Sequence, residues 1–410
     1  MLKNTGFRNG FVEITMLVVT SILIIMTIPF ISRVVTEYKL MAKIYKSTAA
    51  LDLAEAGIER ALWELNYNSS TFSGWTSSTQ GTVTTRIIDC NSFQAAGSTV
   101  IGDYTVSVVT DSSIPTEATI TCTGYVPSRT DTDKSIRQVR ITCAKSNFSK
   151  AVLALNGITM SGQATTDSYD SALGPYSGQT PTQNGDIATN GSITLGSNTY
   201  VNGDANPGPD YPFTSTPPVS GSYGTLQAPF TVDPIPQSTL DSARLNNNNS
   251  AITITDKFGE VTQFTGTVIS LSSEVTMTIP AGTYYFTSIT TTGQALINVS
   301  GAASIYVEGG NINIEGQGLV NTSPDGRPRN LLLYSTGSTI KLAGQAAFAG
   351  AIYAPNATVQ LIGQEQLYGS IVCGSNVDSG QAKIHYDLDL ANVYPVFAAN
   401  RVTSWQEIKQ

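Results

Sequence analysis

The strongest hydrophobic pattern in the chain is an apolar run from Ile14 to Ser32, bounded by Glu13 and Arg33. A run of about 20 apolar residues is long enough to cross the hydrocarbon core of a bilayer as a helix. A short basic leader precedes the run and ends in Gly10-Phe11. An ordinary secretory signal is cut at small residues after its apolar region, and no such site follows this run. The pattern therefore predicts cleavage before the run, which leaves the apolar helix on the mature protein as a membrane anchor.

Apolar positions continue beyond this run at spacings of three and four residues, which is typical of one face of a helix. These positions are Val34, Tyr38, Met41, Tyr45, Thr48, Leu51, Ala54, Ile58, Leu62 and Leu65. We therefore expect one helix from Phe11 to Leu65, about 80 Å long. Pro29 should bend it, because proline removes one backbone donor. A signal-anchor helix followed by a coiled-coil stalk would show the same pattern.

Residues 82–144 contain alternating runs rich in Val, Ile and Thr, which predict an antiparallel sheet packed on the second half of the helix. The last two runs indicate a hairpin around residues 129–135. If Val126 faces Val139, then Cys122 faces Cys143, and a cross-strand disulfide is geometrically reasonable in an oxidising compartment. Two buried free thiols would give the same pattern.

From about residue 149 the chain consists of short strand-like runs separated by Gly, Asn and Ser, such as 295–299, 304–307 and 331–334. A Gly-Gln pair recurs at Gly162-Gln163, Gly293-Gln294, Gly316-Gln317, Gly344-Gln345 and Gly363-Gln364. A loose period of about 20 residues with short strands favours the rungs of a parallel β-solenoid, with a β-sandwich as the alternative. The recurring Gln either forms a ladder of side-chain amides or simply suits a turn.

The predicted fold class is therefore α+β followed by all-β: a long N-terminal transmembrane helix, a small antiparallel sheet and a C-terminal parallel β-solenoid. The predicted divisions are a leader (1–10), the helix (11–66), the sheet head (67–148), the solenoid (149–395) with a Pro-rich insertion (204–250), and a tail (396–410). The prolines of this insertion lie in residues 207–236, and this segment cannot form a helix or a central strand, so it should lie along the solenoid or project as a loop. The tail either docks Trp405 as a cap on the solenoid or is disordered.

Composition narrows the function classes. Charged residues are 13% of the chain, against about 25% in a typical soluble domain, which suits an exported β-rich surface. The formal charge is −8 with no basic cluster, so nucleic acid is not an expected partner.

No CxxC spacing occurs among the four cysteines, and no cofactor or metal is expected. Calcium in the loop from Asp204 to Asp210 is a weaker alternative. Carboxylates are scattered and His385 lies in an alternating strand, so we do not expect an enzyme.

The segment Ala54–Leu62 (AEAGIERAL), together with the Gly-ended basic leader, resembles the N-terminal region of type IV pilin-like proteins of the PilX type. This resemblance implies cleavage between Gly10 and Phe11 by a prepilin peptidase and methylation of the new Phe11 amine. It also implies insertion of the helix into a filament core. Major pilins carry Glu at the fifth mature position, whereas here that residue would be Thr15 and Glu13 would be third. Glu13 either neutralises a neighbour's terminal amine from a shifted place or marks the membrane edge, and the shift favours a low-copy subunit.

A second resemblance lies in the body. The block Phe348–Val372, with Lys383–Asp387 after it, resembles a solenoid domain often found behind PilX-type N-termini. The expected function is that of a minor pilin in pilus assembly, with surface adhesion through the solenoid and a surface or glycan as ligand. The expected partners are other pilins, the inner-membrane assembly platform and the prepilin peptidase. The protein should be single-pass in the inner membrane and then extracellular in a filament or at its tip. The alternatives are a type II secretion pseudopilin, a membrane-anchored solenoid binding protein, and a carbohydrate-active enzyme on a pilin-like stalk.

Overall fold

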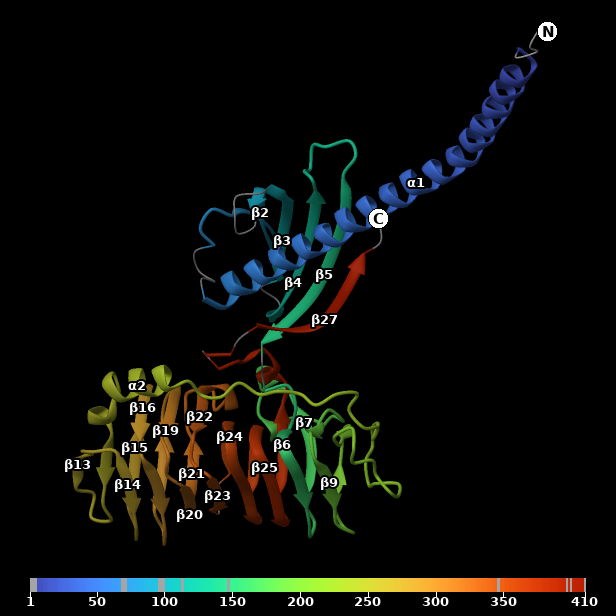
Figure 1. Ribbon diagram of the computed structural model, residues 1–410. Helices are drawn as coiled ribbons and strands as arrows, with labels where there is room; N and C mark the ends of the chain where they lie inside the picture. The colour runs from blue at the N-terminus through green and yellow to red at the C-terminus, as the bar shows by residue number, and fades with distance from the viewer. Residues whose placement is uncertain are drawn as a thin grey trace, which may run out of the picture. The chain divides into compact units, whose positions relative to one another are not determined.

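The computed structural model describes residues 6–67, 72–94, 100–111, 114–145, 148–344, 347–395, 397–398 and 400–408. The chain forms two compact units: unit 1 comprises Met1–Ala144 and Val402–Gln410, and unit 2 comprises Lys145–Arg401 (Figure 1). In the sequence, unit 2 is therefore an insertion within unit 1. The sequence analysis expected head, solenoid and tail to follow one another as separate parts. The end of the chain, Val402–Gln410, instead belongs to the same unit as its beginning.

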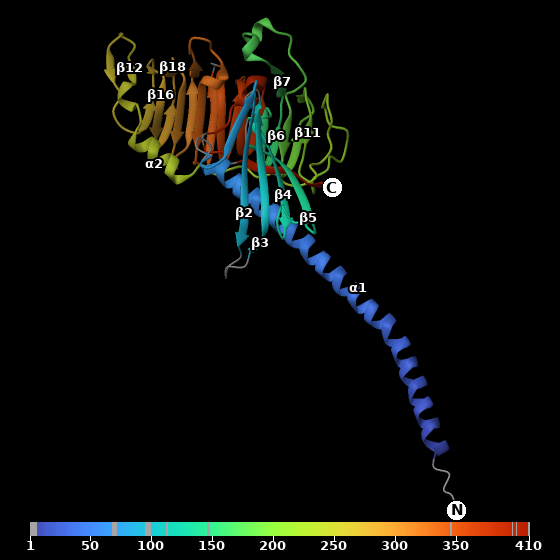
Figure 2. The same cartoon turned by 90° about the horizontal axis from the view of Figure 1, so that it is seen from above.

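Unit 1 begins with the helix α1 (Gly6–Tyr67), which is continuous through Pro29. The sequence predicted this helix with ends at Phe11 and Leu65. Figures 1 and 2 both show α1 curving in its first half. The predicted bend is thus present in the part of the helix that contains the proline, where one backbone hydrogen bond is missing.

The rest of unit 1 is a sheet with the strand order β1-β2-β3-β4-β5-β27, and β1 to β5 pair as antiparallel neighbours. Its strands are β1 (Thr76–Gln80), β2 (Val83–Gln94), β3 (Val100–Asp111), β4 (Ile114–Val126), β5 (Ser135–Lys145) and β27 (Asn400–Ile408). The predicted antiparallel head is present. The expected tail forms its last strand, so the prediction that Trp405 caps the solenoid is wrong. Arg137 forms an ion pair with Glu407, and the Thr403 hydroxyl donates to the Thr142 carbonyl at 3.1 Å, which holds β27 beside β5.

The second half of α1 packs on the sheet through small side chains. Ala50, Ala54 and Ala61 are fully buried there. A Cβ atom on Gly57 would overlap Cys122 Sγ and come within 3.0 Å of Tyr104 Cδ2. On the sheet side, a Cβ atom on Gly124 would overlap the Ala50 carbonyl oxygen. Helix and sheet therefore approach more closely than larger residues would allow, and the small residues of the AEAGIERAL segment provide that approach.

The cysteine prediction was wrong in its register. Val126 pairs with Ser135, so Cys122 lies opposite Val139 and Cys143 lies opposite Ala118. An even shift keeps every side chain on its face of the sheet, so the apolar alternation predicted the correct face but not the partner. All four cysteines are free thiols, as the alternative expectation had it. Burial raises the pKa of Cys122 to about 12 and that of Cys143 to about 11.

Unit 2 is built from short strands that pair in parallel between successive coils of the chain (Figure 1). One ladder runs in the order β14 (Val268–Leu271), β17 (Ser288–Thr291), β20 (Ile312–Gly316), β23 (Thr339–Gly344), β24 (Phe348–Gly363), β25 (Gln366–Gly380), β6 (Val152–Met160) and β9 (Ser192–Leu195). Two further ladders run through β16 (Gly282–Phe286), β19 (Ala303–Val307), β22 (Leu331–Ser335) and β24, and through β15 (Thr276–Ile279), β18 (Leu296–Val299) and β21 (Gly318–Asn321).

The remaining strands and the helix α2 extend or flank these ladders. They are β7 (Thr165–Tyr169), β8 (Ile187–Thr189), β10 (Tyr200–Val201), β11 (Ala205–Asn206), α2 (Gln237–Leu245), β12 (Thr253–Thr255), β13 (Val261–Gln263) and β26 (Lys383–Asp387). Only β12 pairs antiparallel, with β13 and β15, among the paired strands described in unit 2.

The Gly-Gln pairs form turns at one corner of successive coils. Gly293, Gly316, Gly363 and Gly162 all have positive φ, the backbone region that glycine adopts without strain. Gly380-Gln381 is a further pair, which the sequence analysis missed, and its φ is +83°. The glutamines described at these corners are exposed, while Gln345 lies outside the described residues. The positive φ values of these glycines thus explain the repeat as a series of turns.

The Pro-rich segment lies along the coils, as one of the two expectations had it. The Phe230 backbone N–H donates to Asn190 Oδ1 at 2.9 Å, and the Tyr353 hydroxyl donates to the Asp233 carbonyl at 2.6 Å. Ile235, just before α2, and Leu240 of α2 then pack on a row of buried tyrosines. This segment joins the coils at the two ends of the stack.

One coil carries polar groups into the apolar interior. The inward positions form the ladder Ile269, Ile289, Ile312, Ile340, Val359, Asn376, Ile158 and Ile193. Asp378 occupies the next inward position of β25, between Leu361 and Met160. Asn376 Nδ2 donates to Asp378 Oδ2 at 2.8 Å, while both Oδ1 atoms are buried without a partner. Burial raises the pKa of Asp378 to about 7, and a proton on its Oδ1 would supply a donor for the Asn376 acceptor.

We expect Gly57→Ala to destabilise unit 1 by about 1–3 kcal/mol, the usual cost of overpacking a close contact. The helix propensity gained, about 1 kcal/mol, should not offset this, because the new methyl group overlaps Cys122 Sγ. Thermal unfolding of the purified variant measures the effect. Gly178→Ala is the matched control, since nothing lies within 4 Å of its Cβ position. Equal unfolding midpoints for the two variants would show that the close approach is not a constraint.

We expect Asp378→Asn to stabilise unit 2 above neutral pH. The pKa of Asp378 is raised from 3.8 to about 7 on folding, so the folded state binds the proton more tightly. The contribution of Asp378 to stability is therefore highest below about pH 4, falls as the pH rises to about 7 and is constant beyond that, by a total on the order of 4 kcal/mol. The variant should lose this dependence and unfold at higher temperature near pH 8. Asp210→Asn, at an exposed carboxylate, should follow the wild type, and an Asp378 variant that did the same would contradict the buried proton.

Candidate functional surface on the N-terminal helix

The first half of α1 exposes a continuous apolar surface. Its side chains are between 50% and 70% exposed from Ile14 to Ile31. The large residues are Ile14, Met16, Leu17, Val18, Val19, Ile22, Leu23, Ile24, Ile25, Met26, Ile28, Phe30 and Ile31. Within the described part of the chain, one helical stretch (Glu13–Asn66) is long and apolar enough to cross a membrane. Its most apolar 18-residue window has a mean hydropathy of 2.5 and is not buried. An apolar surface of this size is unfavourable in water and marks a site of contact with lipid or protein.

The few polar side chains of this stretch satisfy their hydrogen bonds within the helix. The hydroxyl groups of Thr20, Ser21 and Thr27 donate to backbone carbonyls three or four residues earlier, at 2.7 to 3.1 Å. In an apolar environment an unpaired hydroxyl is costly. These residues therefore do not prevent the stretch from being buried in lipid or in a helical bundle.

The apolar face predicted for α1 has two different surroundings. Val34, Tyr38, Met41 and Tyr45 are exposed, with Tyr38 74% and Tyr45 72% accessible. Burial on the sheet begins only at Ala49. The sheet was predicted to pack on the second half of the helix, and the apolar face is indeed buried there, whereas its positions from residue 34 to 45 are exposed because the sheet covers only the last part of the helix.

The predicted processing residues lie at the beginning of this surface. Gly10 and Phe11 are within α1, but their side chains lie outside the described residues. Glu13 is exposed and precedes the apolar run directly. The structure therefore places the acidic residue at the end of the apolar surface and leaves its predicted role in filament assembly untested.

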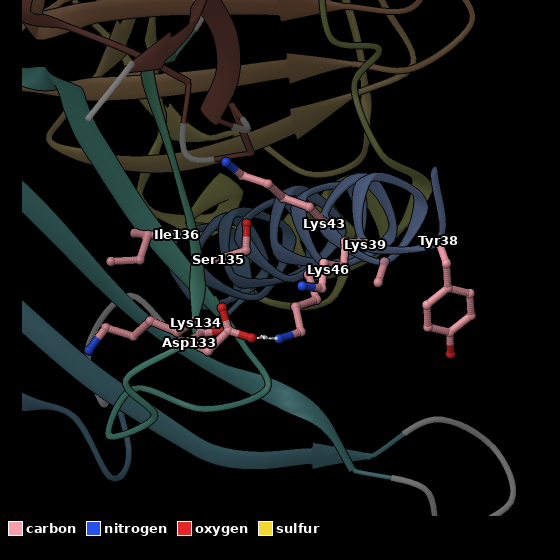
Figure 3. Close-up of a pocket in the computed structure, with 9 residues that line it drawn as sticks. Tyr38, Lys39, Lys43, Lys46, Asp133, Lys134, Ser135 and Ile136 are labelled. Atoms are coloured by element: carbon pink, nitrogen blue, oxygen red, sulfur yellow. Dashed lines mark hydrogen bonds and ion pairs between the residues drawn. The ribbon is translucent and has the colours of Figure 1, made fainter. Parts of the chain in front are cut away.

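A basic pocket follows the apolar stretch, between α1 and the turn that leads into β5 (Figure 3). Its volume is about 860 Å³, and it is lined by Tyr38, Lys39, Ala42, Lys43, Lys46, Asp133, Lys134, Ser135 and Ile136. Lys46 Nζ donates to Asp133 Oδ2 at 2.6 Å and to the Asp133 carbonyl at 3.0 Å. The hydrogen bond from Lys46, and the nearby charge of Lys43, lower the pKa of the Asp133 carboxyl. The sequence analysis found no basic cluster, because Lys134 is distant in sequence from the lysines of the helix.

In unit 2, His385 lies in a closed aromatic cluster. Its Nδ1 is 2.6 Å from Asp167 Oδ1, and its ring lies 4.0 Å from the Tyr176 ring and 4.7 Å from the Tyr368 ring, between centroids. The other Asp167 oxygen accepts the Tyr176 hydroxyl at 2.7 Å. Asp167 had no signal in the sequence, since it is paired with His385 only through the register of β7 and β26.

Asp204, at the start of the loop considered for calcium, instead accepts a backbone hydrogen bond, as does Asp186 in the preceding coil. Asp204 Oδ1 accepts the Ser222 backbone N–H at 2.7 Å, and Asp186 Oδ1 accepts the Asp204 backbone N–H at 2.8 Å. Each carboxylate thus satisfies a backbone donor of the next coil. Among the residues that the structure describes, no group of three or more His, Cys, Asp or Glu side chains is arranged to hold a metal ion.

Comparison with known proteins gives one family match, to a domain of unknown function (DUF7305) over residues 288–393. This region lies within unit 2 and covers less than half of the chain. No curated protein matches the sequence. The chain is similar to the competence-associated pilin ComZ from Thermus thermophilus, with 13% identity, a TM-score of 0.27, and coverage of 88% of this chain and 97% of that one.

It is also similar to a glycosylated ice-binding protein (LeIBP) from an Arctic yeast, with 14% identity, a TM-score of 0.32, and coverage of 58% of this chain and 90% of that one. A second structure of that ice-binding protein gives 16% identity and the same TM-score. Scores this low carry no argument about the fold or the function of this chain.

Proposed function

We propose that this chain is a low-copy, PilX-type pilin-like subunit of a type IV filament system and takes part in filament assembly. In this proposal α1 first anchors the chain in the inner membrane and then packs against the helices of neighbouring subunits in a filament core. The stacked coils of unit 2, which we interpret as the predicted β-solenoid, are exported and available for adhesion to a surface or glycan. Other pilins, the assembly platform and the prepilin peptidase are the partners.

The observation that carries this proposal is that one uninterrupted helix has two environments. Its first half exposes apolar side chains to about Tyr45, and its second half is buried on the sheet from Ala49. A permanent anchor needs only the first half, and a soluble core helix needs only the second. A helix that must leave the membrane while staying attached to its head needs both, and the AEAGIERAL segment provides the attachment.

We further propose that the protein has a structural rather than a catalytic role. His385 supports this view, because its ring is buried between two tyrosines and Asp167 is already engaged by Tyr176. A general base needs access to the proton that it abstracts, and this ring is only 4% exposed.

N-terminal mass spectrometry of the exported protein tests the pilin assignment. We expect a mature chain that begins at Phe11 and carries a methyl group on its amine, since the leader ends at Gly10. Gly10→Val should leave the leader uncut. Gly6→Val is the matched control, because Gly6-Phe7 is a second Gly-Phe step in the leader, and this variant should be processed normally.

An intact Met1 or Leu2 terminus on the exported wild-type protein would contradict the pilin assignment. A terminus at Phe7 would move the cleavage site and with it the role of Glu13. Recovery of the processed protein in sheared filaments from a strain that lacks secretion genes separates a pilus subunit from a secretion pseudopilin. Processed protein found only in the membrane fraction would instead favour an anchored binding protein.

A further inference from the structure

We propose that the basic pocket beside α1 binds the phosphate groups of anionic phospholipids while the helix is in the membrane. This inference rests on the proposed membrane-anchored state of the protein. Four lysines line the pocket against one aspartate, and that aspartate is already paired with Lys46. The pocket therefore has an excess of positive charge that the described residues do not neutralise.

The unpaired charges lie on one face of the helix. Residues three and four apart are neighbours on a helix surface, so Lys39, Lys43 and Lys46 form one row. Lys46 is fixed by Asp133, whereas Lys39 and Lys43 are exposed and form no ion pair within the described residues. Figure 3 shows Lys46 reaching Asp133 while Lys43 points away from that pair. Two ammonium groups are thus free to contact a ligand from outside the chain.

The position of this row along the helix favours lipid headgroups. The run from Ile14 to Ser32 spans about 28 Å, close to the thickness of a hydrocarbon core, which places Arg33 at its boundary. Lys39 and Lys43 follow about 9 and 15 Å further along the axis. Side chains on a helix lean toward its N-terminus, so both ammonium groups reach back toward the headgroups. Tyr38, which also lines the pocket, belongs to a residue type enriched at membrane interfaces.

Binding of lipid phosphates in this pocket would hold the sheet of unit 1 close to the membrane before assembly. Each lysine near an anionic surface contributes an attraction that corresponds to about a fivefold change in binding. This contact is lost when α1 leaves the bilayer, so it distinguishes the membrane state from the filament state. An acidic surface on a neighbouring protein is the competing occupant, but it would require no fixed distance from the apolar run.

The test uses the full-length protein in nanodiscs of phosphatidylcholine alone or with about 30% phosphatidylglycerol. Amine labelling read out by mass spectrometry reports each lysine. We expect Lys39 and Lys43 to react several-fold more slowly in the anionic discs, and salt at about 0.5 M to remove most of this protection. Lys257 and Lys383, exposed in unit 2, are internal controls and should react equally in both lipids.

A paired variant makes the test specific. Lys39→Gln/Lys43→Gln should retain many fewer phosphatidylglycerol molecules in native mass spectrometry, by about 25-fold in affinity if the two lysines add. Lys257→Gln/Lys383→Gln removes the same charge and should behave as wild type. Equal labelling of Lys39 and Lys43 in both lipids would overturn the inference, as would protection by inorganic phosphate in neutral discs. A protein that does not insert into either disc would instead overturn the membrane anchor itself.

Discussion

The close approach between α1 and its sheet is the contact on which unit 1 depends. Gly57 and Gly124 allow the helix backbone and the sheet backbone to come nearer than side chains of ordinary size would permit. The alanines beside them fill the space without pushing the two apart. Because this contact holds only the part of α1 from Ala49 onward, the first half of the helix extends beyond the sheet with its apolar surface exposed. The exposed apolar surface and the basic pocket both lie on the part of α1 that precedes these small residues and that the sheet does not cover.

Patterns with a strong period predicted the elements of this fold well. The helix, the antiparallel head and the short strands of the body were all predicted from sequence, because burial imposes a period of 3.6 or 2 on apolar residues. The same patterns failed where the choice was between equivalent arrangements. The hairpin register was wrong by four residues, since an even shift leaves Cys122 and Cys143 on the same face. The exposed positions of residues 34–45 could not be separated from the buried ones, because both continue one apolar stripe.

Features that depend on contacts between distant residues left little signal in the sequence. Lys134 completes the basic pocket beside Lys43, and Asp167 meets His385 through strand register alone. Asp378 is one of several polar residues in β25, and its burial follows from the phase of this strand rather than from its chemistry. The processing predicted at Gly10-Phe11 is the opposite case: it stays a prediction from the sequence pattern, and the described residues add only the helix in which these two residues lie.

The place of unit 2 within the chain constrains the order of its coils. Its two ends continue into β5 and β27, which are neighbours in the sheet of unit 1. A stack that started at one end and finished at the other would separate these ends by its full length. The chain instead enters at β6 and leaves after β26, and these strands pair with the same neighbour, β25. The coils from β8 to β11 extend in one direction, and the Pro-rich segment and α2 carry the chain to the far end. The later coils then return to the starting point.

The proline content of the Pro-rich segment follows from this route, because the connection must stay extended and must not pair as a central strand. Asn376 and Asp378 lie on β25, the strand where the returning coils meet β6, so the polar break in the interior coincides with a ladder position that joins residues from the two ends of the insertion.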